Sequence, residues 1–298
     1  MQAIDGHSES RFDRLIAFLE QDPDNPNLAG DAIEAAIAED RLGEADALLT
    51  SRDIGEPRAS YLKGLAAMRR QDWSGAAEQY RGMFDAGEGA PAIRFNLAWS
   101  LAMEKQSDEA LSFLDETTAA ALPQAAELEV RLRHELGDFE AAEARARALL
   151  ELHPEHRGLN AAVATLAIDI EDTALAARCA GKAGDHPEAL TTLGTLALET
   201  EDSELARRLF AQALERDPKS PRALIGQGLS RLIDADQVGA AADLDRGAEL
   251  FETHLGSWIA AGWAHFTAGD LATARTRFEH ALALDDSFAE SHGSLAAL

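Results

Sequence analysis

His153 and His156 form the only close pair of histidines in the sequence, separated by Pro154 and Glu155. Imidazole nitrogens bind zinc, but a zinc site needs three or four protein ligands. The other histidines are scattered, and the single cysteine, Cys179, stands among alanines. We therefore expect no bound metal, and we interpret Cys179 as a buried core thiol.

Spacings that carry catalysis are missing from the sequence. It contains no Gly-rich phosphate loop, no HExxH, no Gly-x-Ser-x-Gly and no Cys-x-x-Cys. Because the chain has 53 acidic residues among 298, an acidic pair by itself does not indicate acid–base catalysis. The sequence predicts a protein that is not an enzyme and that uses no cofactor.

The charge balance indicates which partners fit. Lys and Arg total 27 against 53 Asp and Glu, so the formal net charge is −26. Such a field repels nucleic acid and anionic membranes and favours basic partners. The first residues resemble no signal peptide, and no apolar run approaches the ~18 residues of a membrane span. We expect a cytoplasmic protein, and the excess of arginine over lysine with abundant alanine suggests a bacterial one.

A period of about 34 residues organises the chain. Gly194 is followed by Ala206 and Phe210, and the same pattern returns 68 residues later as Gly262, Ala274 and Phe278. Small residues allow two helices to approach closely, and the aromatic ring fills the space beside them. The pattern therefore predicts antiparallel helix hairpins, with turns at Gly137, Glu201 and Gly269.

These residues resemble the tetratricopeptide repeat, with Leu190, Leu193 and Ala213 at further positions of its motif. The resemblance implies an all-α fold, a right-handed superhelical solenoid of antiparallel helix hairpins. Weaker copies extend it over nearly the whole chain. About eight repeats within residues 26–288 are expected at 26–56, 57–90, 91–122, 123–156, 157–186, 187–220, 221–254 and 255–288.

Both ends of the array depart from the repeat. Residues 1–25 are expected to hold an N-terminal capping helix from Ser8 to Gln21. Residues 289–298 start a further helix or a C-terminal cap, which carries Leu295 and Leu298. A capping helix should have a polar outer face. This edge therefore predicts a longer natural chain or a homodimer formed through the C-terminal edge.

In the resembled family, the first helix of each hairpin lines a concave groove that holds the ligand. In this sequence apolar positions at the two ends of that groove flank a polar middle, which includes Thr165, Asp169, Thr192, Thr195 and Glu199. Two interpretations stay open, since these apolar residues either anchor a partner or belong to the helix–helix core. The candidate partner-binding residues are Tyr61, Leu65, Met68, Phe95, Asn96, Trp99, Met103, Arg131, Ile225, Leu229, Ile259, Trp263 and Phe266.

Part of the family holds the carboxylate end of chaperone tails with a set of Lys, Asn and Arg side chains. Here Asn96 occupies one of those places, but its neighbours in the motif are Tyr61, Leu65, Gln124 and Leu128. The sequence does not predict that activity.

The sequence predicts a scaffold or adaptor that binds a partner segment in the groove, one that is apolar with basic flanks. Two alternatives remain. The chain is the recruiting portion of a longer multidomain enzyme, or it is a structural scaffold that associates with itself.

Overall fold

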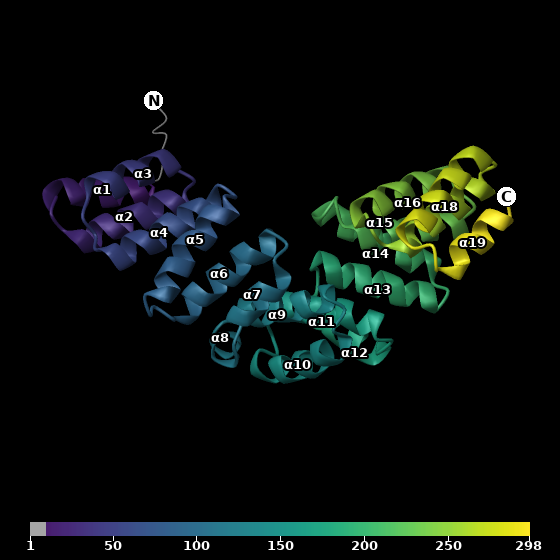
Figure 1. Ribbon diagram of the computed structural model, residues 1–298, viewed down its shortest axis with the longest axis horizontal. Helices are drawn as coiled ribbons and strands as arrows, with labels where there is room; N and C mark the ends of the chain where they lie inside the picture. Colours follow the sequence, from purple (N-terminus) through teal and green to yellow (C-terminus); the bar gives the residue numbers. More distant parts are fainter. Residues whose placement is uncertain (1–9) are drawn as a thin grey trace, which may run out of the picture. The chain divides into compact units, whose positions relative to one another are not determined.

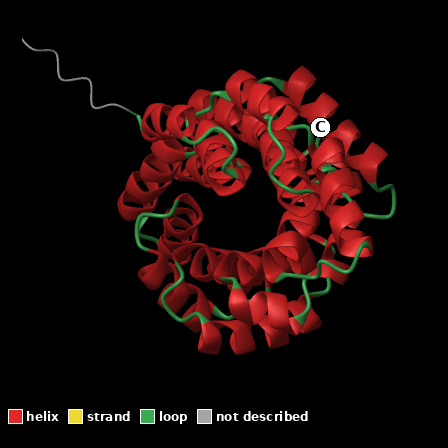
Figure 2. Cartoon of the chain, turned by 90° about the vertical axis from the view of Figure 1, so that its left-hand side faces the viewer, coloured by secondary structure: helices red, strands yellow, loops and turns green. Residues whose placement is uncertain are grey.

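A computed structural model describes residues 10–298, and its helices are drawn in Figure 1. Within these residues all regular structure is α-helical, as expected from the sequence, and no strand occurs (Figure 2). None of these helices is long and apolar enough to cross a membrane. The chain forms two compact units, Met1–Gly137 and Asp138–Leu298. Each unit is a stack of antiparallel helix hairpins, so the predicted all-α solenoid of hairpins is confirmed.

The first unit contains nine helices over its described residues. They are α1 (Arg11–Gln21), α2 (Pro26–Ala38), α3 (Leu42–Ser51), α4 (Glu56–Arg69), α5 (Trp73–Asp85), α6 (Pro91–Met103), α7 (Ser107–Phe113), α8 (Glu116–Ala121) and α9 (Pro123–Glu135). The short helix α8 follows α7 directly and was not expected from the repeat pattern. Residues 1–9, where the predicted capping helix begins, lie outside the described residues.

The second unit contains ten helices. They are α10 (Phe139–Leu152), α11 (Arg157–Asp169), α12 (Thr173–Ala183), α13 (Pro187–Glu199), α14 (Ser203–Arg216), α15 (Pro221–Ile233), α16 (Gln237–Phe251), α17 (Leu255–Thr267), α18 (Leu271–Leu284) and α19 (Ala289–Ala296). The first helices α11, α13 and α15 pack side by side in that order. Each also packs against the second helix of its own hairpin.

The turns inside the hairpins share one geometry. Gly137 and Gly269 adopt positive φ, as expected of residues that stop a helix, and Glu201 and Ala235 adopt the same left-handed conformation without being glycine. An aspartate usually follows and caps the next helix. Asp202, for example, accepts a hydrogen bond from the Leu205 amide at 3.0 Å. The turns predicted at Gly137, Glu201 and Gly269 are therefore confirmed.

Aromatic rings of the second helices lie against glycines of the first helices. Phe210 of α14 is fully buried and touches both Gly194 of α13 and Gly226 of α15, where an added Cβ would collide with the ring. Phe278 meets Gly262 in the same way. The predicted pairing of small and aromatic positions is therefore confirmed. Through its contacts with both glycines, Phe210 also joins two neighbouring hairpins.

The two histidines cap the helices on either side of the turn between α10 and α11. His153 is the C-cap residue of α10, and the Nδ1 atom of His156 accepts a hydrogen bond from the Leu159 amide at 3.1 Å. Within residues 10–298 no group of three or more His, Cys, Asp and Glu side chains could hold a metal ion. Cys179 is buried, as predicted, and burial raises the pKa of its thiol.

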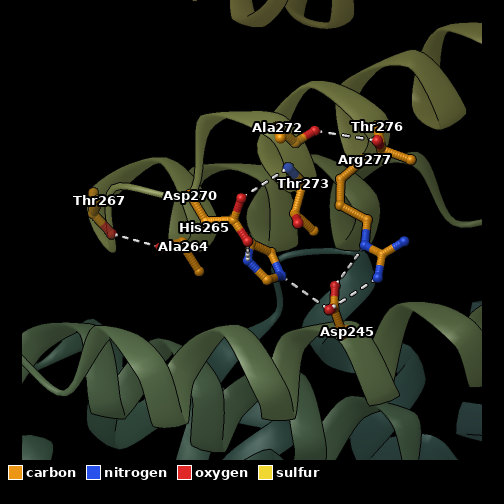
Figure 3. Close-up of polar contacts among 9 residues, drawn as sticks. All are labelled: Asp245, Ala264, His265, Thr267, Asp270, Ala272, Thr273, Thr276 and Arg277. Atoms are coloured by element: carbon orange, nitrogen blue, oxygen red, sulfur yellow. Dashed lines mark hydrogen bonds and ion pairs between the residues drawn. The ribbon is translucent and has the colours of Figure 1, made fainter.

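An ion network joins three helices of the second unit (Figure 3). Asp245 of α16 accepts two hydrogen bonds from Arg277 of α18, at 2.8 and 3.0 Å. It also lies 2.9 Å from Nε2 of His265, on α17. Burial acts to raise the pKa of Asp245, but the hydrogen bonds from Arg277 and His265 outweigh it and hold that pKa below its ordinary value of 3.8.

We expect Asp245→Asn to lower the free energy of unfolding by about 1–3 kcal/mol at pH 7, because the amide cannot replace a charged acceptor. The pKa of Asp245 is depressed in the folded chain, so its contribution is fully present above pH 3.8 and is lost as the pH falls further. The difference in the free energy of unfolding between wild type and Asp245→Asn should therefore become smaller in acid. Urea unfolding at several pH values measures it.

Exposed Asp286 provides the control, and Asp286→Asn should change stability by no more than about 0.5 kcal/mol. If the difference in unfolding free energy between wild type and Asp245→Asn stayed unchanged below pH 3, the pH-dependent stability would not come from the Asp245 carboxylate.

Candidate partner-binding surface

The first helices of the hairpins present one position in common. Counted from the first residue of α6, α9, α11, α13, α15 and α17, the ninth residue is in turn Trp99, Arg131, Thr165, Thr195, Leu229 and Trp263. Thr165 and Thr195 line the same pocket, although they lie on different helices. The ninth residues of α11 and α13 therefore lie on one shared face of the second unit.

The pocket on this face encloses about 210 Å³ between α11, α13, α15 and the end of α16. Four threonines line it: Thr165, Thr191, Thr192 and Thr195. Ile168, Pro221 and Phe251 supply apolar wall, and Glu188, Asp217 and Arg222 supply charge. The sequence placed Thr165, Thr192 and Thr195 together in the polar middle of the groove, and the structure brings them together.

An ion pair joins α11 to α15 at this pocket. Both Nη atoms of Arg222 donate to the Asp169 carboxylate, at 3.0 and 2.6 Å. This paired geometry is the strong one for a guanidinium and a carboxylate. The sequence indicated Asp169 as a groove residue but did not indicate Arg222. No local pattern could have paired two residues that lie 53 positions apart.

A histidine lies beside the same ion pair. The Nδ1 atom of His254 is 2.6 Å from the Ser257 hydroxyl, and the imidazole ring lies 4.9 Å from the Phe251 ring. Burial and the positive charge of Arg222 lower the pKa of His254, and the nearby Asp169 opposes them only in part. His254 is therefore uncharged at neutral pH.

In the first unit most of the candidate residues pack against the core. Tyr61, Leu65, Met68, Phe95 and Trp99 are half-buried against core clusters of this unit. The rings of Tyr61 and Tyr80 are 5.8 Å apart, and those of Phe95 and Trp99 are 6.1 Å apart.

Two other candidates of this unit lie at opposite extremes of burial. Asn96 is buried, whereas Met103 is 42% exposed and is the most exposed of the apolar candidates in the first unit. Arg131 pairs with Glu127 of its own helix at 3.0 Å.

In the second unit the candidates divide between surface and core. Leu229 is 37% exposed, and Ile233 at the end of the same helix is 61% exposed. Ile225 is half-buried against a core cluster. Ile259 is only 3% exposed and belongs to the core, so it offers a partner almost no surface.

Trp263 and Phe266 take part in packing. The Trp263 ring lies 5.3 Å from the ring of core residue Phe278 and equally far from Phe266. These contacts favour the core interpretation of Trp263, one of the two that the sequence left open. Leu295 and Leu298 of the C-terminal edge are half-buried against the same cluster. This edge has less free apolar surface than its sequence suggested.

Fold and surface together define a class. The chain is a helical-repeat protein in which stacked hairpins bring the first helices of each unit to one face. Its residues 61–126 and 191–253 match the family model of the tetratricopeptide repeat. These two segments thus belong to the tetratricopeptide repeat family that the resemblance implied.

Solved structures share this fold at low sequence identity. In the crystal structure of the APC/C hetero-tetramer Cut9–Hcn1, the similarity covers 96% of this chain at 14% identity, with a TM-score of 0.67. This chain spans 58% of the length of that one.

Two other structures are similar over less of the chain. A tetratricopeptide repeat protein from Parabacteroides merdae ATCC 43184 covers 80% of this chain and is itself covered to 97%, with 17% identity and a TM-score of 0.57. The type IV pilus biogenesis factor PilW covers 69% and is covered to 98%, with 15% identity and a TM-score of 0.52. No curated protein matches the sequence.

Proposed function

We propose that this chain is an adaptor that binds a segment of another protein along the exposed face of its first helices. The observation that carries the proposal is the face of α11, α13 and α15 in the second unit. A pocket lies there at the first turn of α15, and the apolar side chains of Leu229 and Ile233, further along the same helix, stay exposed. Exposed apolar side chains and pockets are both typical of interaction sites.

The chemistry of the partner segment follows from the charges. The chain carries a net charge of −26, so it attracts basic segments and repels acidic ones. Apolar side chains of the segment would pack on Leu229 and Ile233, while Lys or Arg residues would flank them. Met103 offers a second apolar contact in the first unit. The amino-acid composition supports a bacterial origin, and we assign the adaptor to the cytoplasm.

We expect Leu229→Glu combined with Ile233→Glu to weaken peptide binding by at least about tenfold. The double variant loses two apolar contacts, and binding would have to desolvate two carboxylates in their place. The probes are peptides selected from a random display library on the wild-type chain. Fluorescence anisotropy then measures their affinity for each variant, and we expect the selected peptides to combine apolar residues with Lys or Arg.

Val238 of α16 offers a matched control, since it is apolar and 77% exposed but lies on a second helix. Val238→Glu should leave peptide affinity unchanged. The proposal fails if the selected peptides bind the double variant as tightly as wild type, or if no peptide is enriched. Circular dichroism of every variant verifies the helical content.

A further inference from the structure

The pocket on α11, α13 and α15 has its own hydrogen-bonding character. Three of its threonines use their hydroxyl hydrogens within the helices. Thr165 donates to the Ala161 carbonyl at 3.2 Å, Thr191 to the Pro187 carbonyl at 2.9 Å, and Thr195 to the Thr191 carbonyl at 3.1 Å. Each oxygen therefore has only lone pairs left for a ligand. These hydroxyls accept hydrogen bonds from a ligand and cannot donate to it.

Thr192 is the fourth threonine of the pocket and differs from the others. No hydrogen bond ties its hydroxyl to another residue in the described part of the chain, and its oxygen stays open to the pocket that Thr192 lines. Because Thr192 lines the pocket, its hydroxyl can accept a hydrogen bond from a bound ligand or donate one to it.

The charges around the pocket favour a cation. Glu188 and Asp217 contribute two carboxylates. The single positive group of the lining, Arg222, already donates to both oxygens of Asp169. His254 beside Phe251 is uncharged, because burial and Arg222 lower its pKa. The groups that face the pocket therefore carry a net negative charge and present acceptors.

Size and wall limit the ligand further. The volume of about 210 Å³ lies below the ~300–1,000 Å³ of pockets that hold drug-sized molecules. Ile168, Pro221 and Phe251 form an apolar wall, which suits the methylene stem of a long basic side chain. The Phe251 ring already has the Arg222 guanidinium over it, 5.7 Å from its centroid, so it serves as apolar wall for the ligand's stem.

We infer that this pocket binds the side chain of one lysine or arginine of the partner segment, with the acceptor hydroxyls and carboxylates around the cationic head and the apolar wall along its stem. This inference rests on the proposed function, because it specifies how a partner segment is recognised. It assigns the preference for basic residues to one site rather than to the diffuse negative charge of the chain.

Blocked amino acids test the pocket without a partner protein. The full chain, labelled at threonine methyl groups, is titrated by NMR with N-acetyl-arginine methylamide and N-acetyl-lysine methylamide. The methyl signals of Thr165, Thr192 and Thr195 should shift and saturate, whereas Thr50 and Thr276 elsewhere should not. The citrulline analogue has the shape of arginine without its charge and should bind at least about tenfold more weakly. The glutamate analogue should cause no shift.

Two variants locate the binding groups. Thr192→Val keeps the shape of the side chain and removes the hydroxyl, and Glu188→Gln keeps the shape and removes the charge. Each should weaken the arginine probe by about fivefold or more. Thr276→Val on α18, an exposed threonine in the same unit, should have no effect.

Several outcomes would overturn the inference. They are equal binding of the arginine and citrulline probes, preference for the glutamate probe, or shifts spread evenly over all threonines. The test is separate from that of the proposed function. If the arginine probe binds but no peptide is selected, the pocket stands and the adaptor role fails. If peptides are selected but the probe does not shift the pocket threonines, the adaptor role stands and this inference fails.

Discussion

Phe210→Ala should lower the free energy of unfolding by about 3–5 kcal/mol, the range for truncating a buried aromatic residue. Phe210 is fully buried, and its ring touches Gly194 on one neighbouring helix and Gly226 on another. Truncation therefore removes packing inside one hairpin and between two hairpins at once. In a repeat stack both contributions add to the stability of the unit.

Urea unfolding and hydrogen exchange together measure this effect. The loss of protection against exchange should concentrate in α13, α14 and α15, because these helices surround the ring. Val238→Ala is the control, since Val238 is largely exposed and its truncation should cost no more than about 0.5 kcal/mol. If Phe210→Ala cost no more than this control, the ring would not be the contact that joins the hairpins.

Gly194→Ala should destabilise the chain by about 1–3 kcal/mol, as overpacking does in a filled core. A Cβ at Gly194 would lie 2.7 Å from the nearest atom of the Phe210 ring. The ring cannot move aside easily, because Gly226 meets it from the next hairpin. The penalty should therefore exceed the ~1 kcal/mol by which alanine is the better helix former.

The same substitution at Gly82 is the matched control. Gly82 lies inside α5, and a Cβ there would meet nothing within 4 Å. Gly82→Ala should stabilise the chain by about 0.5–1 kcal/mol. The double variant Gly194→Ala with Phe210→Leu should recover part of the loss, since leucine leaves room for the new methyl group. If both alanine variants stabilise the chain, the close approach at Gly194 is not rigid.

The hairpins themselves were predictable from the sequence because their causes are local. The spacing of Gly194 and Phe210 requires one helix to approach another closely, and Phe278 repeats that requirement with Gly262. Positive-φ glycines such as Gly269, followed by capping aspartates, end one helix and start the next within a few residues. These interactions act over a single hairpin, so they can be read from the order of residues.

The candidate surface was only partly predictable. The sequence placed Thr165, Thr192 and Thr195 on the groove face, because the resemblance implies that first helices line the groove, and all three line one pocket. It could not distinguish Leu229, which is exposed, from Ile259, which is buried. Both lie on first helices with similar apolar spacing. Burial depends on which neighbouring side chain covers the position, as Phe278 does for Trp263, and a single helix does not specify that.

The sequence by itself determined the class of fold, the turns, the buried aromatic rings and the negative charge of this protein. Only the tertiary structure decided where the pocket lies. The pocket requires α11, α13 and α15 to stack so that Arg222 reaches Asp169, 53 residues earlier. The packing of three successive hairpins brings these two distant residues into contact. Periodicity and capping, in contrast, depend only on residues within one or two turns of helix.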